Sequence, residues 1–310
     1  MDDVAALRVS AEKGDIGAIT MLGRRMLLGL GMRRDIASGV ALIDQATQRG
    51  DAEASVLAAI FAAWGFMRPR DFAKAYALLA GAAGKGWEPA QRELALLSRP
   101  VLDHAAMVEA RASSPLSLSP RISAVTNFLT SQECDWLIEG ARVGRRRALV
   151  NVDSAAMVES DGRTNTETDY TIANASVMLA VVRERIANTL GLASSHFEGS
   201  KLLHYEPGQQ FGLHADFQDT RKPELAREVE LRGQRVATFL IYLNDDFEGG
   251  ETDFPEANVR FKGKRGDALM FWNVDKRGAP DFRTVHAGLP PTRGQKWLFS
   301  QWVRSKPVPL

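Results

Sequence analysis

The chain has 310 residues, 45% hydrophobic and 25% charged, which is enough for two ordinary globular domains or one large one. A formal net charge of +1 gives no general drive toward nucleic acid or acidic membranes, and a single cysteine, Cys134, excludes an intramolecular disulfide and a cysteine-based metal site. The longest nearly apolar run, residues 54–67, is too short to span a bilayer, and no secretory signal is visible, so we expect a cytoplasmic protein without nucleic-acid or membrane partners.

The first hundred residues contain an internal repeat. The segments "GDIGA", "GDAEA" and "GWEPA" begin at positions 14, 50 and 86 and therefore recur every 36 residues. Such a period, rich in small residues, is typical of helix–turn–helix units that stack as a solenoid. The units resemble tetratricopeptide-like repeats of the Sel type, which predicts an α-helical repeat domain over residues 1–97. Such arrays commonly bind proteins or peptides, although packing against a neighbouring domain explains them equally well.

Prolines and serines between residues 98 and 120 predict a linker around one short helix. A second domain is expected over residues 121–310. It begins with a helix whose Thr130 and Glu133 have capping-box spacing, and a second amphipathic helix ends near Gly191. Short strands follow, one of them over residues 259–273, separated by glycine, proline, asparagine and aspartate, which predicts a jelly-roll barrel with the two helices outside it. The expected fold class is therefore α+β.

Three residues of this second domain suggest a metal site. In a strand, residues i and i+2 project to the same face, so His214 and Asp216 in "FGLHADF" can point into one cavity. His286 lies on another predicted strand near the end of the barrel. Two imidazoles and one carboxylate form the facial triad suited to non-haem Fe(II), with three coordination positions left open. A histidine and an aspartate at this spacing also occur by accident, and the third candidate is what strengthens the prediction.

A lysine follows the last of these residues at close range. Lys296 lies in "RGQKWLFSQW", between apolar and aromatic neighbours, where burial of its charge is costly without an anionic partner. A cosubstrate that carries a carboxylate would supply that partner.

Residues 121–305 resemble the prolyl 4-hydroxylase branch of the Fe(II)/2-oxoglutarate dioxygenases. The order and spacing of several motifs carry the resemblance. They are "FLTSQECDWLI", "GRTN", "HYEPGQQFGLHAD", "ATFLIYLND" with "EGGETDFP", "GDALMFWN" and "VHAGLPPTRGQKW".

The resemblance implies a role for each matching position. His214, Asp216 and His286 would bind Fe(II), and Lys296 would pair with the distal carboxylate of 2-oxoglutarate. Tyr205 would hydrogen-bond this cosubstrate. Further candidates are Thr252 in the same pocket and Arg163, Arg235 and Trp302 around the substrate. Each of the last three also has an ordinary interpretation: an exposed loop charge, a strand-edge charge and a core aromatic.

The implied reaction consumes O2 and 2-oxoglutarate, releases succinate and CO2, and hydroxylates an unactivated C–H bond, with ascorbate as a candidate auxiliary cofactor. A prolyl or other residue of a protein or peptide is the expected substrate, recruited by the repeats. A free amino acid or small natural product is the rival substrate. A non-catalytic adaptor with a metal-binding barrel is the rival class, which the triad, Lys296 and Tyr205 disfavour. The charged segments 151–170 and 218–234 are predicted to be mobile lids.

Overall fold

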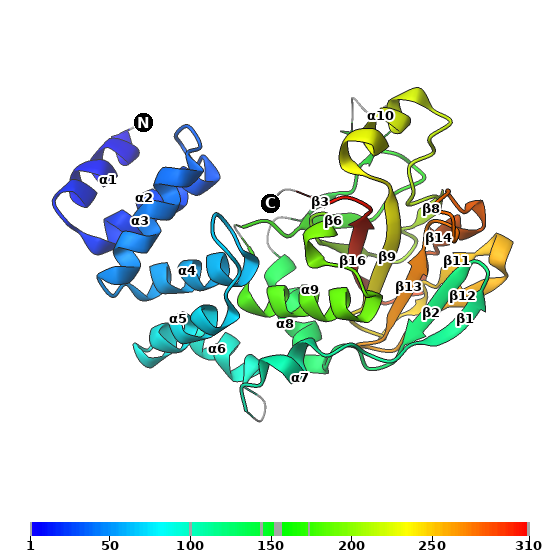
Figure 1. The fold of residues 1–310 in the computed structure, drawn as a ribbon, viewed down its shortest axis with the longest axis horizontal. Coiled ribbons are helices and arrows are strands. Elements are labelled where there is room, and N and C mark those ends of the chain that lie inside the picture. The colour runs from blue at the N-terminus through cyan, green and yellow to red at the C-terminus, as the bar shows by residue number, and fades with distance from the viewer. Residues whose placement is uncertain (1, 99–100, 143–144, 152–156, 173, 309–310) are drawn as a thin grey trace. The chain divides into compact units, whose positions relative to one another are not determined.

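The computed structural model describes residues 2–98, 101–142, 145–151, 157–172 and 174–308 (Figure 1). Contacts between residues divide the chain into two compact units. Met1–Val108 and Ala175–Arg183 form the first, called the repeat unit, and Glu109–Asn174 and Glu184–Leu310 form the second, called the barrel unit. Among the described residues, no helix is long and apolar enough to cross a membrane.

The repeat unit is built from helices that recur with the period of the sequence. They are α1 (Asp2–Glu12), α2 (Ile16–Leu28), α3 (Ile36–Gln48), α4 (Ala52–Trp64), α5 (Phe72–Gly84), α6 (Glu88–Leu97) and α7 (His104–Val108). The repeated aspartates are helix N-caps: Asp15 accepts a hydrogen bond from the Ala18 amide at 2.9 Å, and Asp51 accepts one from the Ala54 amide at 2.7 Å. The predicted helical repeat is thus confirmed.

Glycines at equivalent positions end the first helix of each full repeat. Gly29 and Gly65 have φ angles of +71° and +69°, a left-handed conformation in which glycine is favoured because it has no Cβ. Basic side chains link neighbouring repeats in the same register. Arg49 Nη2 donates to the Gly14 carbonyl at 2.8 Å, and Lys85 Nζ donates to the Gly50 carbonyl at 2.6 Å.

The barrel unit contains two main antiparallel sheets. The larger has the strand order β1-β2-β13-β9-β16-β7-β6-β3, and the smaller has the order β12-β11-β14-β8. The strands of the larger sheet are β1 (Ser114–Leu118), β2 (Arg121–Val125), β3 (Arg146–Arg147), β6 (Thr166–Asp169), β7 (Lys201–Tyr205), β9 (Arg235–Tyr242), β13 (Ala268–Trp272) and β16 (Lys296–Arg304). Those of the smaller sheet are β8 (Phe211–His214), β11 (Thr252–Phe254), β12 (Val259–Phe261) and β14 (His286–Gly288). Two short pairs, β4 (Val150–Asn151) with β5 (Met157–Val158) and β10 (Glu248–Gly249) with β15 (Pro291–Arg293), complete the strands.

Side chains from both sheets form one apolar core. Leu203, Leu240 and Leu298 come from the larger sheet and Phe254 comes from the smaller one. This is the predicted jelly-roll arrangement, and its core lies beside the pocket described below. Helices α8 (Ser131–Ala141), α9 (Val177–Leu190) and α10 (Pro223–Arg232) lie outside the strands (Figure 1).

Helix α8 begins as its sequence predicts. The Thr130 hydroxyl accepts a hydrogen bond from the Glu133 amide at 3.2 Å, and the Glu133 carboxylate accepts one from the Thr130 amide at 2.7 Å. This reciprocal pair is a capping box. Glu133 also forms an ion pair with Arg185 of α9 at 2.9 Å, which fixes the two helices to each other.

The structure differs from the sequence prediction in two segments. The predicted linker, residues 98–120, contains the one short helix that was expected, α7, which belongs to the repeat unit, but it also contains β1, which pairs with β2 of the barrel unit. The predicted single strand over residues 259–273 is two strands, β12 and β13, which belong to different sheets. The chain turns at Gly266, whose φ is +87° and where a Cβ would lie 2.2 Å from the Leu129 carbonyl oxygen.

Candidate active site

The three predicted metal ligands lie together in the barrel unit. His214 ends β8 and His286 begins β14, and the two residues are direct partners in the antiparallel pairing of these strands. His214 Nε2 is 3.6 Å from Asp216 Oδ1, and His286 Nε2 is 3.9 Å from Asp216 Oδ2. One ligand atom from each of the three residues lies within 4.8 Å of the others.

Asp216 reaches this cluster by a different path from the predicted one. Residue alternation predicts that Asp216 lies on the same strand face as His214, but β8 ends at His214 and Asp216 lies in the bend that follows. The side chains still converge, because the chain turns toward the ligand cluster after leaving the sheet.

The histidines are prepared to bind a metal through Nε2. His214 Nδ1 lies 2.8 Å from the Gly212 carbonyl oxygen, and His286 Nδ1 lies 3.0 Å from the Thr284 carbonyl oxygen. A carbonyl only accepts hydrogen bonds, so each Nδ1 carries the proton and each Nε2 has a free lone pair. Burial, together with the neighbouring His286, lowers the pKa of His214 to about 3, which keeps it in the neutral form that ligates metals. The donor set fits Fe(II).

Aromatic rings hold both imidazoles in place. The ring of Phe211 stacks on His214 with centroids 3.5 Å apart and an interplanar angle of 8°. Phe254 stacks on His286 with centroids 5.1 Å apart and an angle of 28°. These contacts restrict the rotation of the imidazole rings, so the ligand positions are preorganised.

Lys296 lines the same pocket, where it begins β16 opposite Tyr205 of β7. Its side chain is completely buried, and its Nζ donates to the Gly250 carbonyl at 2.8 Å. Burial lowers the pKa of Lys296 to about 7, and no ion pair to it occurs among the described residues. The ammonium group therefore suits an anion that enters the pocket.

Tyr205 and Thr252 line this pocket as predicted, but they offer different groups. The Tyr205 ring lies 5.1 Å from Lys296 Nζ, and its hydroxyl has room because Gly288 carries no side chain: a Cβ there would be 3.4 Å from that oxygen. Tyr242 donates its hydroxyl proton to the Phe261 carbonyl at 3.0 Å and accepts from Thr252 at 2.8 Å. Thr252 thus presents an acceptor rather than a donor to the pocket.

Two of the three predicted substrate residues line the pocket. Arg163 is buried, forms an ion pair with Glu167 at 2.9 Å, and lies 4.3 Å from the centroid of the Phe211 ring. Trp302 also lines the pocket wall. Neither is therefore the exposed charge or simple core aromatic of the ordinary interpretation.

Arg235 contacts the pocket wall through Trp302. Its guanidinium carbon lies 3.8 Å from the centroid of the Trp302 ring, and its Nε and Nη2 donate to the two carboxylate oxygens of Glu198 at 2.7 and 2.9 Å. This planar, two-bond pairing fixes the guanidinium against the indole. Arg235 is thus partly buried and paired, so the strand-edge interpretation is wrong.

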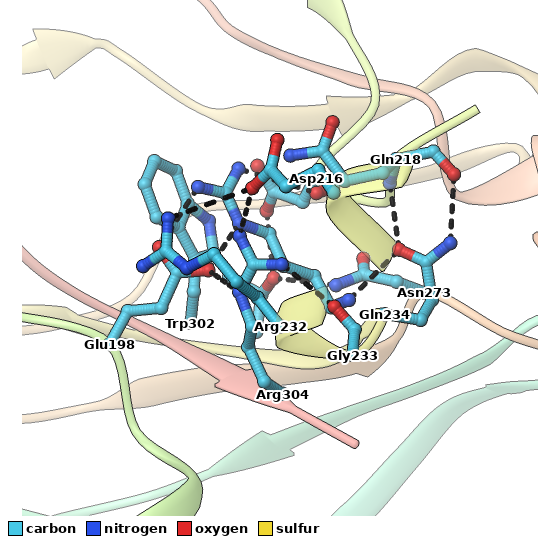
Figure 2. Close-up of polar contacts among 12 residues, drawn as sticks. Glu198, Asp216, Gln218, Arg232, Gly233, Gln234, Asn273, Trp302 and Arg304 are labelled. Atoms are coloured by element: carbon cyan, nitrogen blue, oxygen red, sulfur yellow. Dashed lines mark hydrogen bonds and ion pairs between the residues drawn. The ribbon is translucent and has the colours of Figure 1, made fainter. Parts of the chain in front are cut away.

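A larger ionic network continues from this pair (Figure 2). Glu198 also accepts from Arg304 at 2.6 Å, and Arg304, which is fully buried, binds Glu228 of α10 at 2.6 Å. The side chain of Gln234 donates to the Gln218 carbonyl at 2.7 Å and accepts from the Gln218 amide at 2.7 Å. The segment 218–234, predicted as a lid, thus contains a helix and is fastened at its base. In the other predicted lid, residues 152–156 lie outside the described residues.

Sequence reasoning missed four polar residues near the site, three of them buried and the fourth, Glu198, partly buried. Glu198 and Arg304 support Trp302 through Arg235, and Thr238 and Asn273 contact the Asp216 carboxylate directly or through one another. A signal was available for Thr238, because a single threonine interrupts the otherwise aliphatic and aromatic strand "VATFLIYL". A buried polar side chain in such a run needs a partner.

Comparisons with known proteins agree with this geometry. Residues 200–304 match the profile of the 2OG-Fe(II) oxygenase superfamily. The chain is 33% identical over 210 residues to probable prolyl 4-hydroxylase 3 of Arabidopsis thaliana, a match that covers 61% of this chain and 70% of that protein. The chain belongs to the prolyl 4-hydroxylase family. Another relative, prolyl 4-hydroxylase 1 of the same plant, is 34% identical over 207 residues, covering 62% of this chain and 71% of that protein.

Solved structures with some likeness to the chain were also found. The viral collagen prolyl hydroxylase of Paramecium Bursaria Chlorella virus-1 is 27% identical, with a TM-score of 0.46, over 60% of this chain and 96% of that one. A Sel1 repeat protein from Oxalobacter formigenes is 23% identical, with a TM-score of 0.31, over 33% of this chain and 77% of that one. Membership of the prolyl 4-hydroxylase family makes the chain a 2-oxoglutarate-dependent dioxygenase that uses Fe(II), 2-oxoglutarate and O2.

Proposed function

We propose that the protein hydroxylates prolyl residues of a protein or peptide, with Fe(II) held by His214, Asp216 and His286. The observation that carries the proposal is one pocket that contains three converging ligand side chains and a buried lysine, Lys296, without an anionic partner among the described residues. The names of the similar proteins support the prolyl substrate, because both named plant relatives are called prolyl 4-hydroxylases.

The protein groups have separate tasks in this reaction. When bound, Fe(II) supplies the oxidising chemistry by which one oxygen atom of O2 enters a substrate C–H bond, while 2-oxoglutarate becomes succinate and CO2. Lys296 would bind the distal carboxylate of 2-oxoglutarate, since its buried ammonium group gains a charge partner there. The Tyr205 hydroxyl would donate a hydrogen bond to the same carboxylate. Thr252 would shape the pocket wall and offer its hydroxyl oxygen as a hydrogen-bond acceptor.

The pocket walls would position the substrate. Trp302 offers a flat face held by Arg235, and Arg163 is fixed beside Phe211. Both arginines are already paired with carboxylates, so they would act mainly by shape and by donors to substrate carbonyls rather than by binding an acidic side chain. Such preorganised groups lower the barrier by orienting the reacting C–H bond.

The test is a turnover assay with purified protein, Fe(II), 2-oxoglutarate and ascorbate. A proline-containing peptide is compared with the same peptide carrying alanine at that position and with free proline. We expect the proline peptide, and neither of the other two compounds, to gain one oxygen atom, in an amount equal to the succinate formed. Modification of free proline alone, or of no proline compound while succinate forms, would overturn the substrate proposal. Omitting ascorbate tests its auxiliary role in the same experiment.

We also propose that the repeat unit recruits the protein substrate. A hollow on its surface has a net positive lining: three exposed arginines and one aspartate, with three apolar side chains, namely Arg8, Arg33, Arg34, Asp35, Met26, Met32 and Ile36. Opposite charges attract, so an acidic segment of the substrate, away from its hydroxylated proline, is the expected occupant. A tethered target would gain local concentration at the site.

Point variants test recruitment better than truncation. Residues 175–183 belong to the repeat unit, where the Glu93 carboxylate accepts from the Met178 amide at 2.7 Å and Trp64 Nε1 donates to the Ser176 carbonyl at 2.9 Å. Removing the repeats would therefore leave Ser176 and Met178, at the start of α9, without these hydrogen-bond partners. Arg8→Glu with Arg33→Glu should raise KM for an acidic protein substrate and leave KM for a short neutral peptide unchanged. An equal KM for both substrates in variant and parent would refute recruitment at this hollow.

We further propose that the protein works in the cytoplasm. The support is its cysteine usage: Cys134 is the single cysteine and is buried. Fractionation of cells that express the full chain tests this, and recovery from an oxidising compartment would refute it.

A further inference from the structure

A buried hydrogen-bond chain ends on the carboxylate of Asp216. Asn273 follows β13, and Thr238 lies on the neighbouring strand β9. Asn273 Nδ2 donates to Thr238 Oγ1 at 2.9 Å, and Thr238 Oγ1 donates to Asp216 Oδ2 at 2.7 Å. Thr238 and Asn273 are completely buried, and Asp216 is buried too.

The proton positions in this chain are fixed by elementary chemistry. An amide nitrogen only donates, so the Thr238 oxygen must accept from Asn273. The Thr238 hydroxyl has one proton to donate. Its second partner in this series of hydrogen bonds is the carboxylate of Asp216, which accepts. The Thr238 proton is therefore directed at Asp216 Oδ2. Reversal of the Asn273 amide would present an oxygen to Thr238 and compete for that proton.

This arrangement makes the two oxygens of Asp216 unequal. Oδ1 lies 3.6 Å from His214 Nε2 and Oδ2 lies 3.9 Å from His286 Nε2, so the histidines alone leave either oxygen available to a metal. The hydrogen bond from Thr238 engages Oδ2 and leaves Oδ1 as the free ligand atom. A carboxylate that binds through one oxygen occupies one coordination position, whereas a two-oxygen mode would occupy one of the positions the cosubstrates need.

We propose that Thr238, oriented by Asn273, is a positioning residue that makes Asp216 a one-oxygen metal ligand. The inference rests on the proposed metal site. It adds two residues, neither of which contacts the metal, that set how one of its ligands binds. Outer hydrogen-bond partners of metal ligands typically change metal affinity or activity by about 10- to 100-fold when they are removed.

The experiment uses the full chain and Co(II) as the probe metal, with binding followed by visible absorption without O2. Thr238→Val keeps the shape of the side chain and removes the donor. We expect Co(II) affinity to fall by about tenfold or more and succinate to exceed hydroxylated peptide. Thr238→Ser restores the hydroxyl and should recover both. Asn273→Ala leaves the hydroxyl free to rotate, so its loss of affinity should be smaller than that of Thr238→Val.

Thr168→Val is the matched control. Thr168 is a buried threonine of the same unit, whose hydroxyl donates to the Ala141 carbonyl at 2.9 Å outside the pocket. It should lose similar thermal stability without loss of Co(II) affinity. Parent affinity in Thr238→Val, or equal losses in Thr238→Val and Thr168→Val, would overturn the positioning role. If Thr238→Val does not fold, parent affinity in Asn273→Ala overturns it instead. Parent affinity in His214→Ala would refute the metal site itself, which separates the two failures.

Discussion

The N-caps of the repeat helices and the polar side chains around the barrel pocket find their partners over different distances along the chain. In the repeat unit, Asp15 and Asp51 each accept from an amide three residues away, and both caps are at the surface or only partly buried. In the barrel unit, Thr238 meets Asp216 across 22 residues and Arg304 meets Glu198 across 106 residues, with little exposure. Local contacts at the surface of a helix contribute little individually, whereas a buried group that loses a distant partner has no water to replace it. Substitutions in the barrel unit should therefore have the larger effects.

The largest effect is expected from the metal ligands. His214→Ala or His286→Ala should abolish succinate formation, because the remaining two ligands no longer enclose one face of the metal. The assay is succinate release with Fe(II) and 2-oxoglutarate. His104→Ala is the matched control, since His104 bonds to Tyr76 in the repeat unit and should leave the rate unchanged. Succinate at the parent rate in either ligand variant would contradict the site.

The next effect should be selective for the cosubstrate. Lys296→Ala removes a buried charge partner, at a cost of a few kcal/mol for a desolvated pair, so Kd for 2-oxoglutarate should rise by about 100-fold or more. Co(II) affinity without 2-oxoglutarate should stay close to that of the parent, because Lys296 does not touch the ligands. Lys264→Ala, an exposed change, is the control. Equal 2-oxoglutarate affinity in Lys296→Ala and parent would make the lysine purely structural.

The same lysine predicts a pH dependence with a definite sign. Burial lowers the pKa of Lys296 to about 7, so the free protein loses this charge as pH rises above about 7. A bound carboxylate favours the charged form, so 2-oxoglutarate binding should take up a proton above that pH and weaken by up to about tenfold per pH unit. Calorimetry in two buffers of different ionisation enthalpy measures the uptake. Binding that is independent of pH from neutral to alkaline values would show that the lysine stays charged.

A smaller effect is expected at the pocket wall. Trp302→Leu removes the face on which Arg235 stacks, a contact worth about 0.5–2 kcal/mol. KM for the peptide should rise several-fold, while KM for 2-oxoglutarate should not change. Steady-state kinetics with each substrate varied in turn separates the two. If only KM for 2-oxoglutarate changes, Trp302 contacts the cosubstrate rather than the peptide substrate.

The same difference in range explains what the sequence could predict. The repeat period and the capping box at Thr130 depend on neighbouring residues, and the structure confirms both. The residues that resemble the family motif also converge, although the role of each stays a proposal. Thr238 and Asn273 could not be paired in advance, because their contact depends on the register of β9 against β13.

Two further misses have local causes. Helix α10 falls within a predicted lid because half of its segment "PELAREVELR" is charged, and the structure buries none of its residues fully. It is held by an ion pair between its Glu228 and Arg304, a residue far along the chain. Asp216 was placed on a strand because residue alternation says nothing about where pairing ends, and β8 ends two residues earlier.

The smallest effect is expected in the repeat unit, and it tests whether the two units are independent. Asp51→Ala removes the N-cap of α4 and should lower the free energy of unfolding by about 1 kcal/mol, whereas Asp51→Asn keeps an acceptor and should be nearly neutral. Urea unfolding followed by circular dichroism measures the free energy of unfolding. Succinate release measures the activity of the barrel unit. We expect Asp51→Ala to leave kcat and both KM values unchanged, because its contact closes within three residues and reaches no pocket residue. Lower turnover in Asp51→Ala, with parent turnover in Asp51→Asn, would contradict this expectation. It would mean that the helix caps of the repeat unit affect the pocket of the barrel unit, so the two units would not be independent.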